Sequence, residues 1–300
     1  MPEELIISPD VIVPAAERNS CGESPFWSAM DNSFQWVDIP AKRIHRWRLG
    51  ESACDTWQLA EQAGCIARQS GGGVLAACES GLFSVTLEAT PGVTLRAAFT
   101  HPAEGMRFND GKCDRAGNLW VSNFMMSADK RPVGALFRYT KEGLSAPKLD
   151  GFMTPNGMAF SPDNRTLYIS DSHTAVRKVW AMNFDLDSGA LGERRMFVDM
   201  AQYKGRPDGA SIDTDGCYWV AGIDDGCIMR FTPSGKLDRI LRLPVKYPTM
   251  CAFGGADMKT MFVTSLQRAG AEAAADPLGG SVLCFEVQAQ GIPEVAFAGF

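Results

Sequence analysis

The sequence is poor in histidine, a residue on which many hydrolytic and metal sites depend. It has only three, His45, His101 and His173, and they stand far apart. A histidine zinc site or a Ser-His-Asp triad would need them, and no pattern places one beside a nucleophile. His173 follows Asp171 and Ser172, but closeness along the chain favours a loop hydrogen bond over triad geometry. The scarcity of histidine therefore argues against both kinds of site.

The chain also lacks paired cysteines and long apolar runs. Its nine cysteines are an odd number, are scattered, and include no CxxC pair, which indicates free thiols in a reducing compartment. No stretch approaches the ~20 apolar residues of a membrane helix. The acidic segment Met1–Leu5 is not followed by the apolar region of a secretory signal. We therefore expect a cytoplasmic protein with no membrane partner.

Basic runs and nucleotide-binding motifs are absent as well. The net charge is −6, and no Lys/Arg stripe is present, so we expect no nucleic-acid partner. Gly71-Gly72-Gly73 lacks the Lys and Ser/Thr of a phosphate loop and is typical of a turn. Gly22-Glu23-Ser24-Pro25-Phe26 does not match the GxSxG nucleophile elbow. The expected partner is a small molecule, and the expected assembly is a monomer or a weak homo-oligomer.

Against these absences stands a repeated unit, rich in glycine and aromatic residues. Six segments each consist of a polar turn followed by an aromatic or β-branched strand, and their strand centres lie roughly 40–50 residues apart, the interval of one four-stranded propeller blade. These segments are Trp27–Asp38, Gly71–Ala77, Asp114–Ser122, Ser161–Ser170, Asp213–Ala221 and Gly255–Thr264. Further strands are predicted after them, at Ile44–Trp47, Gly81–Val85, Ala135–Tyr139, Val176–Trp180, Cys227–Phe231 and Ser281–Phe285.

The repeats predict an all-β, six-bladed β-propeller that occupies residues 1–300 as one domain. An open β-sandwich is the alternative, which the regular repetition disfavours. Residues Asp10–Val13 could close the ring as the outer strand of the last blade. Helical signal is weak, and the Ala-rich stretch Ala269–Ala275 is expected to be a loop or a single turn.

Four polar clusters occupy the same place in their repeats, about ten residues before the aromatic strand. Their central residues are Glu23, Asn109, Asn156 and Asp208. Equivalent positions of successive blades converge on the channel of a propeller, so we expect these four side chains to meet. Each cluster alone is more typical of a turn, and Pro155-Asn156-Gly157 in particular predicts one. Together the carboxylates and carboxamides form an oxygen-rich site suited to Ca²⁺, Mg²⁺ or Mn²⁺, with Zn²⁺ also possible.

At these clusters the chain resembles the SMP-30/gluconolactonase/luciferin-regenerating-enzyme family, which includes regucalcin-like proteins. Five matching motifs follow in family order: Gly22–Trp27, Arg107–Lys112, Pro155–Met158, Pro207–Gly209 and Pro248–Gly255. The resemblance covers essentially the whole chain. It implies a six-bladed propeller with one divalent metal cation in the channel, bound by Glu23, Asn156 and Asp208. It also implies that Arg107 and Asn109 hold a sugar lactone.

The resemblance implies a metal-dependent lactonase that converts an aldonolactone into its aldonic acid. Asp208, a metal ligand with a second oxygen, is expected to act as general base on water. Some relatives carry a substrate-contacting Glu shortly after the third repeat, where this chain has Asn123–Ser127 without a carboxylate. Trp27 and Phe108 could pack on a sugar face or in the blade core. The alternatives are a hydrolase acting on phosphotriesters or larger lactones, and a non-enzymatic metal-binding or interaction propeller.

Overall fold

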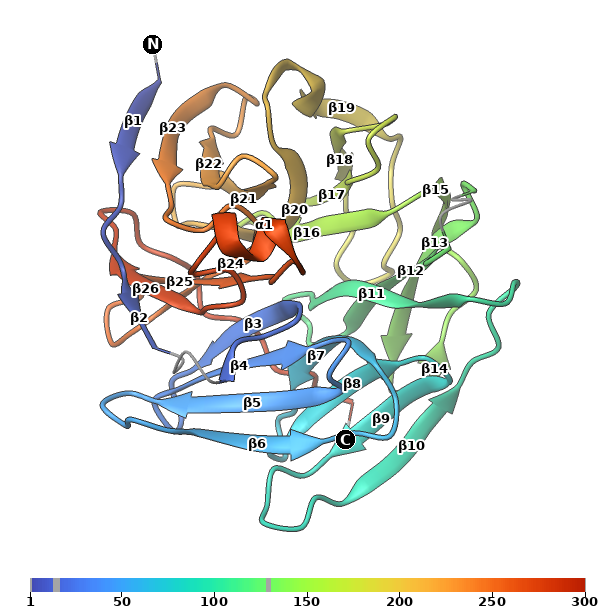
Figure 1. The fold of residues 1–300 in the computed structure, drawn as a ribbon. Coiled ribbons are helices and arrows are strands. Elements are labelled where there is room, and N and C mark those ends of the chain that lie inside the picture. The colour runs from blue at the N-terminus through green and yellow to red at the C-terminus, as the bar shows by residue number, and fades with distance from the viewer. Residues whose placement is uncertain (1, 13–16, 128–130, 300) are drawn as a thin grey trace.

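Six sheets, one for each repeat, surround a central axis in the computed structural model (Figure 1). The structure describes residues 2–12, 17–127 and 131–299. We label the sheets blades A to F in chain order. The innermost strands of neighbouring blades contact one another in a closed ring, in the order β3, β7, β11, β16, β20, β24 and back to β3. The predicted six-bladed β-propeller is therefore confirmed.

The strands of blades A to C, from the axis outward, are β3 (Gly22–Ser28), β4 (Ser33–Asp38), β5 (Arg43–Arg48) and β6 (Cys54–Gln58); β7 (Ala63–Arg68), β8 (Val74–Cys78), β9 (Gly81–Val85) and β10 (Val93–Ala98); and β11 (Met106–Cys113), β12 (Leu119–Met125), β13 (Gly134–Thr140), β14 (Gly143–Leu144) and β15 (Leu149–Phe152). In blade C, both β14 and β15 pair with β13.

The strands of blades D to F are β16 (Pro155–Phe160), β17 (Thr166–Asp171), β18 (Lys178–Asn183) and β19 (Arg195–Asp199); β20 (Arg206–Ile212), β21 (Tyr218–Ile223), β22 (Cys227–Phe231) and β23 (Leu237–Arg242); and β24 (Pro248–Gly254), β25 (Thr260–Ser265) and β26 (Leu283–Glu286). The six aromatic segments of the sequence are the second strands of their blades, and the strands predicted after them are the third strands, with β18 and β26 each starting two residues later than predicted.

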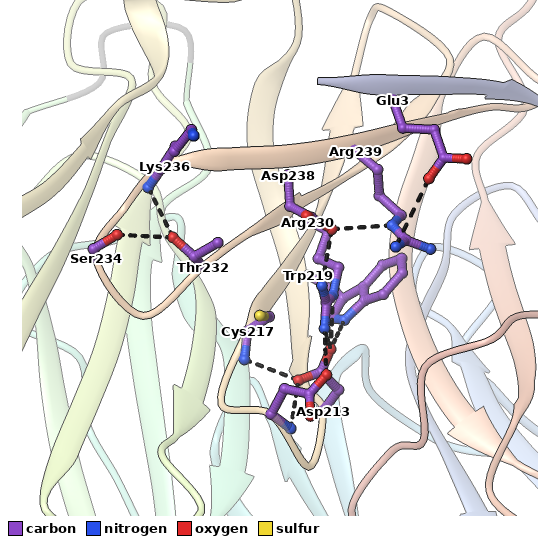
Figure 2. Close-up of polar contacts among 11 residues, drawn as sticks. Glu3, Asp213, Cys217, Trp219, Arg230, Thr232, Ser234, Lys236, Asp238 and Arg239 are labelled. Carbon is purple, nitrogen blue, oxygen red and sulfur yellow. Dashed lines mark hydrogen bonds and ion pairs between the residues drawn. The ribbon is translucent and has the colours of Figure 1, made fainter. Parts of the chain in front are cut away.

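The turn and the aromatic strand of a repeat are joined by one aspartate, as blade E shows (Figure 2). Asp213 Oδ1 accepts hydrogen bonds from the backbone N–H groups of Asp215 and Cys217, which shapes the turn after β20. Its Oδ2 accepts from the indole N–H of Trp219 at 2.8 Å and from Arg230 on the third strand. The polar turn and the aromatic strand thus form one unit, which explains why they recur together in the sequence.

Blade C repeats this unit with Asp114, Trp120 and Arg138. Asp114 Oδ2 accepts from the Trp120 indole at 3.0 Å and from Arg138 at 3.2 Å. Both tryptophans and both aspartates are fully buried. Because a buried charge without a partner is costly, the arginine makes the buried aspartate tolerable.

The N-terminal segment closes the ring. Strand β2 (Asp10–Val11) pairs antiparallel with β26, so the predicted outer strand of the last blade is confirmed, while Val13 lies outside the described residues. Strand β1 (Glu3–Ile6), which the sequence did not predict, pairs parallel with β23 of blade E. The two short strands thereby join blades E and F at their outer edges, as Figure 1 shows.

Two smaller elements complete the described fold. A 3₁₀ turn, η2 (Met200–Gln202), precedes β20, and helix α1 (Ala271–Ala275) lies in the Ala-rich stretch, where a loop or single turn was expected. Within the described ranges, no helix has the length and apolar character needed to cross a bilayer.

The C-terminal segment lies against the turns that follow the innermost strands. Gly291 bridges to Asp213 of blade E, and Phe297 bridges to Gln69 of blade B. Glu294 pairs with Lys112 of β11 at 2.7 Å. The segment therefore connects blades at the end of the axis opposite the starts of the innermost strands.

Candidate functional site

The predicted residues lie where the innermost strands are irregular. The pairing register shifts between Glu23 and Phe26 in β3, Phe108 and Gly111 in β11, Asn156 and Ala159 in β16, and Pro207 and Ala210 in β20. Such bulges re-aim side chains and are common beside active sites. The four clusters are thus equivalent in structure as well as in sequence.

The turn predicted at Pro155-Asn156-Gly157 is wrong, because these residues start strand β16. Gly157 has φ +60°, a conformation that suits a bulge as well as a turn, so the Asn-Gly pair does not distinguish them. A Cβ on Gly157 would lie 2.5 Å from the Tyr218 hydroxyl and 2.7 Å from Ser170 Oγ. The bulge therefore requires glycine for both conformation and space.

Two of the predicted side chains, Asn109 and Asn156, touch directly across blades C and D. Asn109 Nδ2 donates to Asn156 Oδ1 at 2.8 Å and to the Pro155 carbonyl at 2.9 Å. Arg107 Nη1 in turn donates to Asn109 Oδ1 at 2.8 Å. Both asparagines are buried. The expectation that the four cluster residues meet is therefore confirmed for Asn109 and Asn156, and Arg107 joins them.

The carboxylates of Glu23 and Asp208 belong to the same neighbourhood. Burial raises the pKa of Glu23 well above its usual value, and the nearby carboxylates of Asp208 and Asp110 raise it further, while Arg107 lowers it. Burial lowers the pKa of Arg107, and the charges of Cys21 and Glu23 oppose that effect. The charges of acidic groups from blades A, C and E thus act on one another here.

Residues that the sequence did not single out hold this arrangement. Ser172, just after β17, accepts from Asn156 Nδ2 at 2.8 Å and donates to the Pro207 carbonyl. Asp110 Oδ2 accepts from the Met158 backbone at 2.9 Å, and the Tyr218 hydroxyl donates to the Gly157 carbonyl at 2.7 Å. Asp110 lies inside the motif Arg107–Lys112, but no local pattern in the sequence links Ser172 or Tyr218 to Asn156.

Other sequence candidates have structural roles. His173 forms loop hydrogen bonds with Asp171 and Ala175, as expected. Trp27 stacks on Phe262 with ring centroids 5.6 Å apart, and Phe108 is fully buried, so both belong to the blade core.

The stretch without a carboxylate, residues 123–127, begins with another structural residue. Asn123 is buried, lies 3.0 Å from His101 Nδ1 through its Nδ2, and accepts the Ala135 backbone N–H. Its carboxamide thus connects β12 to β13 and to the segment before β11.

The donor set suits a hard divalent cation. Within the described residues, no group of three or more His, Cys, Asp or Glu side chains has a metal-binding arrangement. A candidate centre would consist of the Glu23 and Asp208 carboxylates with the Asn156 carboxamide oxygen, which keeps a second lone pair beside its bond from Asn109. Oxygen ligands of this kind fit Ca²⁺, Mg²⁺ or Mn²⁺, and a bound cation would relieve the repulsion between the carboxylates.

The structure also has a surface groove away from these residues. A groove of about 600 Å³ runs between the outer turns of blades D and E, lined among others by Asp163, Arg195, Met196 and Asp215. None of the four clusters contributes to its lining.

Comparison with known proteins places this geometry in a family. Residues 21–267 match the SMP-30/Gluconolactonase/LRE-like region. The chain is 36% identical to a 6-deoxy-6-sulfogluconolactonase of Pseudomonas putida, over 93% of this chain and 95% of that protein. It is 33% identical to regucalcin of Danio rerio, over 83% of this chain and 84% of the relative.

A solved structure gives the same result. The calcium-binding protein regucalcin from Agrobacterium tumefaciens superposes with a TM-score of 0.92 at 25% identity, covering 99% of both chains. The resemblance first seen in five short motifs thus extends along the whole chain. The protein belongs to the SMP-30/gluconolactonase/LRE-like family.

Proposed function

We propose that this protein is a metal-assisted lactonase that hydrolyses a sugar lactone of the aldonolactone class to the aldonic acid. The proposal rests on the place of Glu23, Asn109, Asn156 and Asp208 at equivalent strand bulges of four blades. Asn109 and Asn156 touch directly, and the charge of Asp208 acts on Glu23. Residues that serve only the fold need no carboxylates facing one another. The lactonase type of enzyme is confirmed by the sulfogluconolactonase relative, which matches nearly the whole chain.

Glu23, Asn156 and Asp208 would hold the cation. A regucalcin of the same fold is described as calcium-binding, which supports a divalent ion in this family. Bound there, the cation would supply Lewis acidity toward the lactone carbonyl and its developing negative charge.

The chain's own residues have separable tasks in this proposal. Asp208 accepts a proton from the water that attacks the carbonyl carbon, and the proton passes to the ring oxygen as the ester bond breaks. Arg107 presents a guanidinium fork to substrate oxygens. Asn109 already donates both of its amide N–H groups to Asn156 and Pro155, so it offers a hydroxyl group the second lone pair of its oxygen. Water, lactone and protons balance to one hydroxy acid with no other reactant.

The substituent at carbon 6 of the sugar is the natural variable to test. By its name, the Pseudomonas relative acts on a gluconolactone with a sulfonate at that position. We propose to compare glucono-1,5-lactone, pentonolactones, 6-sulfonated gluconolactone, a larger lactone and a phosphotriester, each with added Ca²⁺, Mn²⁺, Mg²⁺ or Zn²⁺. The readout is proton release above spontaneous hydrolysis.

Preferred turnover of an aldonolactone, lost on chelation, is the expected result. Preference for the phosphotriester or the larger lactone would support the alternative function, a hydrolase of those substrates, instead of the sugar lactonase. No turnover of any substrate with any ion would favour a non-enzymatic metal-binding propeller.

A further inference from the structure

A chain of four hydrogen bonds crosses the candidate site from blade C to blade E. Arg107 donates to Asn109 Oδ1, Asn109 Nδ2 donates to Asn156 Oδ1, and both contacts measure 2.8 Å. Asn156 Nδ2 then donates to Ser172 Oγ, also at 2.8 Å. The Ser172 hydroxyl donates to the carbonyl of Pro207, the residue before Asp208. The chain therefore links three strands that carry site residues.

The direction of every bond in this chain is determined by its two ends. A guanidinium can only donate and a backbone carbonyl can only accept. Ser172 has one hydroxyl proton, which it gives to Pro207, so its oxygen must accept from Asn156. The amide nitrogen of Asn156 must then lie beside Ser172, and the oxygen must lie on the side of β11. A carboxamide without such neighbours could adopt either orientation.

We propose that Ser172 is a positioning residue that fixes the orientation of the Asn156 carboxamide and aligns it with the strand bearing Asp208. The inference rests on the proposed metal-binding role of Asn156 and Asp208. Without the Ser172 oxygen, the Asn156 amide nitrogen loses its acceptor, and the carboxamide is held only by the bond that its oxygen accepts from Asn109. The proposed ligand oxygen is then less firmly positioned. The link to Pro207, which holds β16 and β20 in register at the two proposed ligands, is lost with it.

Ser170 provides a matched control two residues earlier. Its side chain is fully buried like that of Ser172. Its hydroxyl has no hydrogen-bond partner among the residues that the structure describes. Ser170→Ala therefore removes an equally buried hydroxyl from the same segment without removing a hydrogen bond of the chain.

The test is calorimetric titration of metal-free full-length protein with Ca²⁺ and with Mn²⁺, in wild type, Ser172→Ala and Ser170→Ala. We expect Ser172→Ala to raise the metal dissociation constant roughly 10- to 100-fold, as is usual when a partner of a metal ligand is lost. Ser170→Ala should bind as wild type does. Melting curves without metal show that the variants are folded.

Each outcome bears on a different proposal. Equal affinities in wild type and Ser172→Ala, or an equal loss in Ser170→Ala, would overturn the role of Ser172 alone. Absence of binding by wild type would overturn the metal site itself, and this inference with it. If Ser172→Ala does not fold, Ser172→Cys serves instead, because a thiol accepts hydrogen bonds only weakly; unchanged affinity in that variant would also refute the role.

Discussion

Carboxylates are buried in two parts of this propeller, within the blades and at the channel, and the two settings differ in what surrounds them. In blade E, Asp213 accepts from backbone N–H groups and from Trp219, and it pairs with Arg230 at 2.7 Å (Figure 2). At the channel, the charges of two further carboxylates act on Glu23, and the charge of Arg107 opposes them. The blade carboxylate is neutralised by the chain itself, whereas the channel carboxylates repel one another.

This difference in surroundings distinguishes a buried carboxylate that serves the fold from one that serves a function. A buried charge that serves the fold is surrounded by donors, because the fold could not otherwise afford it. A cluster of like charges lowers stability unless something outside the chain compensates them, and perturbed groups of this kind gather at functional sites. Substitution of an aspartate is therefore expected to affect mainly stability in a blade and mainly activity at the channel.

The largest effect is expected from Asp208→Asn. Loss of the proposed general base alone should lower kcat roughly 10²- to 10⁴-fold, and loss of a metal ligand adds to this. Without metal, the free energy of unfolding should not decrease, because repulsion with Glu23 is removed. Lactone turnover and urea unfolding measure the two quantities. Near wild-type kcat with metal present would contradict the mechanism.

Asp213→Asn, the same substitution inside a blade, should do the reverse. It leaves Arg230 with a weakened partner and turns an amide toward the donors of Trp219 and Arg230. Arg230 keeps its ion pairs with Asp215 and Asp238, so the cost should lie near or below the lower end of the about 3–5 kcal/mol of a broken buried ion pair, which urea unfolding would show. The folded fraction should keep wild-type kcat and KM. A stable but inactive variant would mean that the distinction between the two regions fails.

A third kind of buried titratable group, His45 in blade A, predicts how stability varies with pH. It stacks on Trp36 and bonds Thr56, and burial lowers its pKa to about 4 from the usual 6.5. Between these values the unfolded chain binds more protons than the folded one, so stability falls as pH falls, by up to roughly 3 kcal/mol.

The measurement is the free energy of unfolding at about pH 7 and about pH 4.5 in wild type and His45→Gln. The variant should lose less stability between the two values, because other acidic groups titrate alike in both proteins. Identical losses would show that folding does not lower the pKa of His45.

Metal should stabilise the channel cluster and leave the blades unaffected. At a Ca²⁺ or Mn²⁺ concentration about 100 times the dissociation constant, the folded state should gain about 2.7 kcal/mol. Glu23→Gln should abolish the accompanying rise in melting temperature. Glu51→Gln, on an exposed turn of the same blade, should retain it. An equal rise in both variants would place the ion elsewhere.

The smallest effect is expected from Asn109→Ala. Asn109 is proposed to hold substrate hydroxyls in the ground state and transition state alike, so KM should rise about tenfold with a lesser change in kcat. Steady-state kinetics on the preferred lactone would test this. If kcat falls as far as in Asp208→Asn, Asn109 acts with the metal ligands instead.

The sequence predicted the propeller because its repeat is a local unit. Asp213 lies six residues before Trp219, so the turn and the strand that it joins are visible in one short segment. The contact between Asn109 and Asn156 was predicted from repeat position, since equivalent strands meet at one axis. The features that could be predicted from the sequence were therefore those that recur in every blade.

The features that were missed depend on contacts between distant segments. The bulge at Asn156-Gly157 resembles a turn in sequence, and only its pairing with β17 distinguishes the two. Ser172 contacts Pro207, 35 positions away, through a hydroxyl that any loop serine possesses. Strand β1 pairs with residues 239–242. It has only four residues, which is too short for a hydrophobic periodicity that would predict a strand.

The position of β1 and β2 has a consequence for how the chain is made. These strands precede blade A in the sequence, yet their partners are residues 239–242 of blade E and 283–284 of blade F. Contacts between such distant positions are slow to form, and multi-element chains otherwise fold from the N-terminus. Strand β1 therefore stays unpaired until β23 has been made, and β2 stays unpaired until β26 has been made. A segment that precedes the ring in sequence forms one of its last seams.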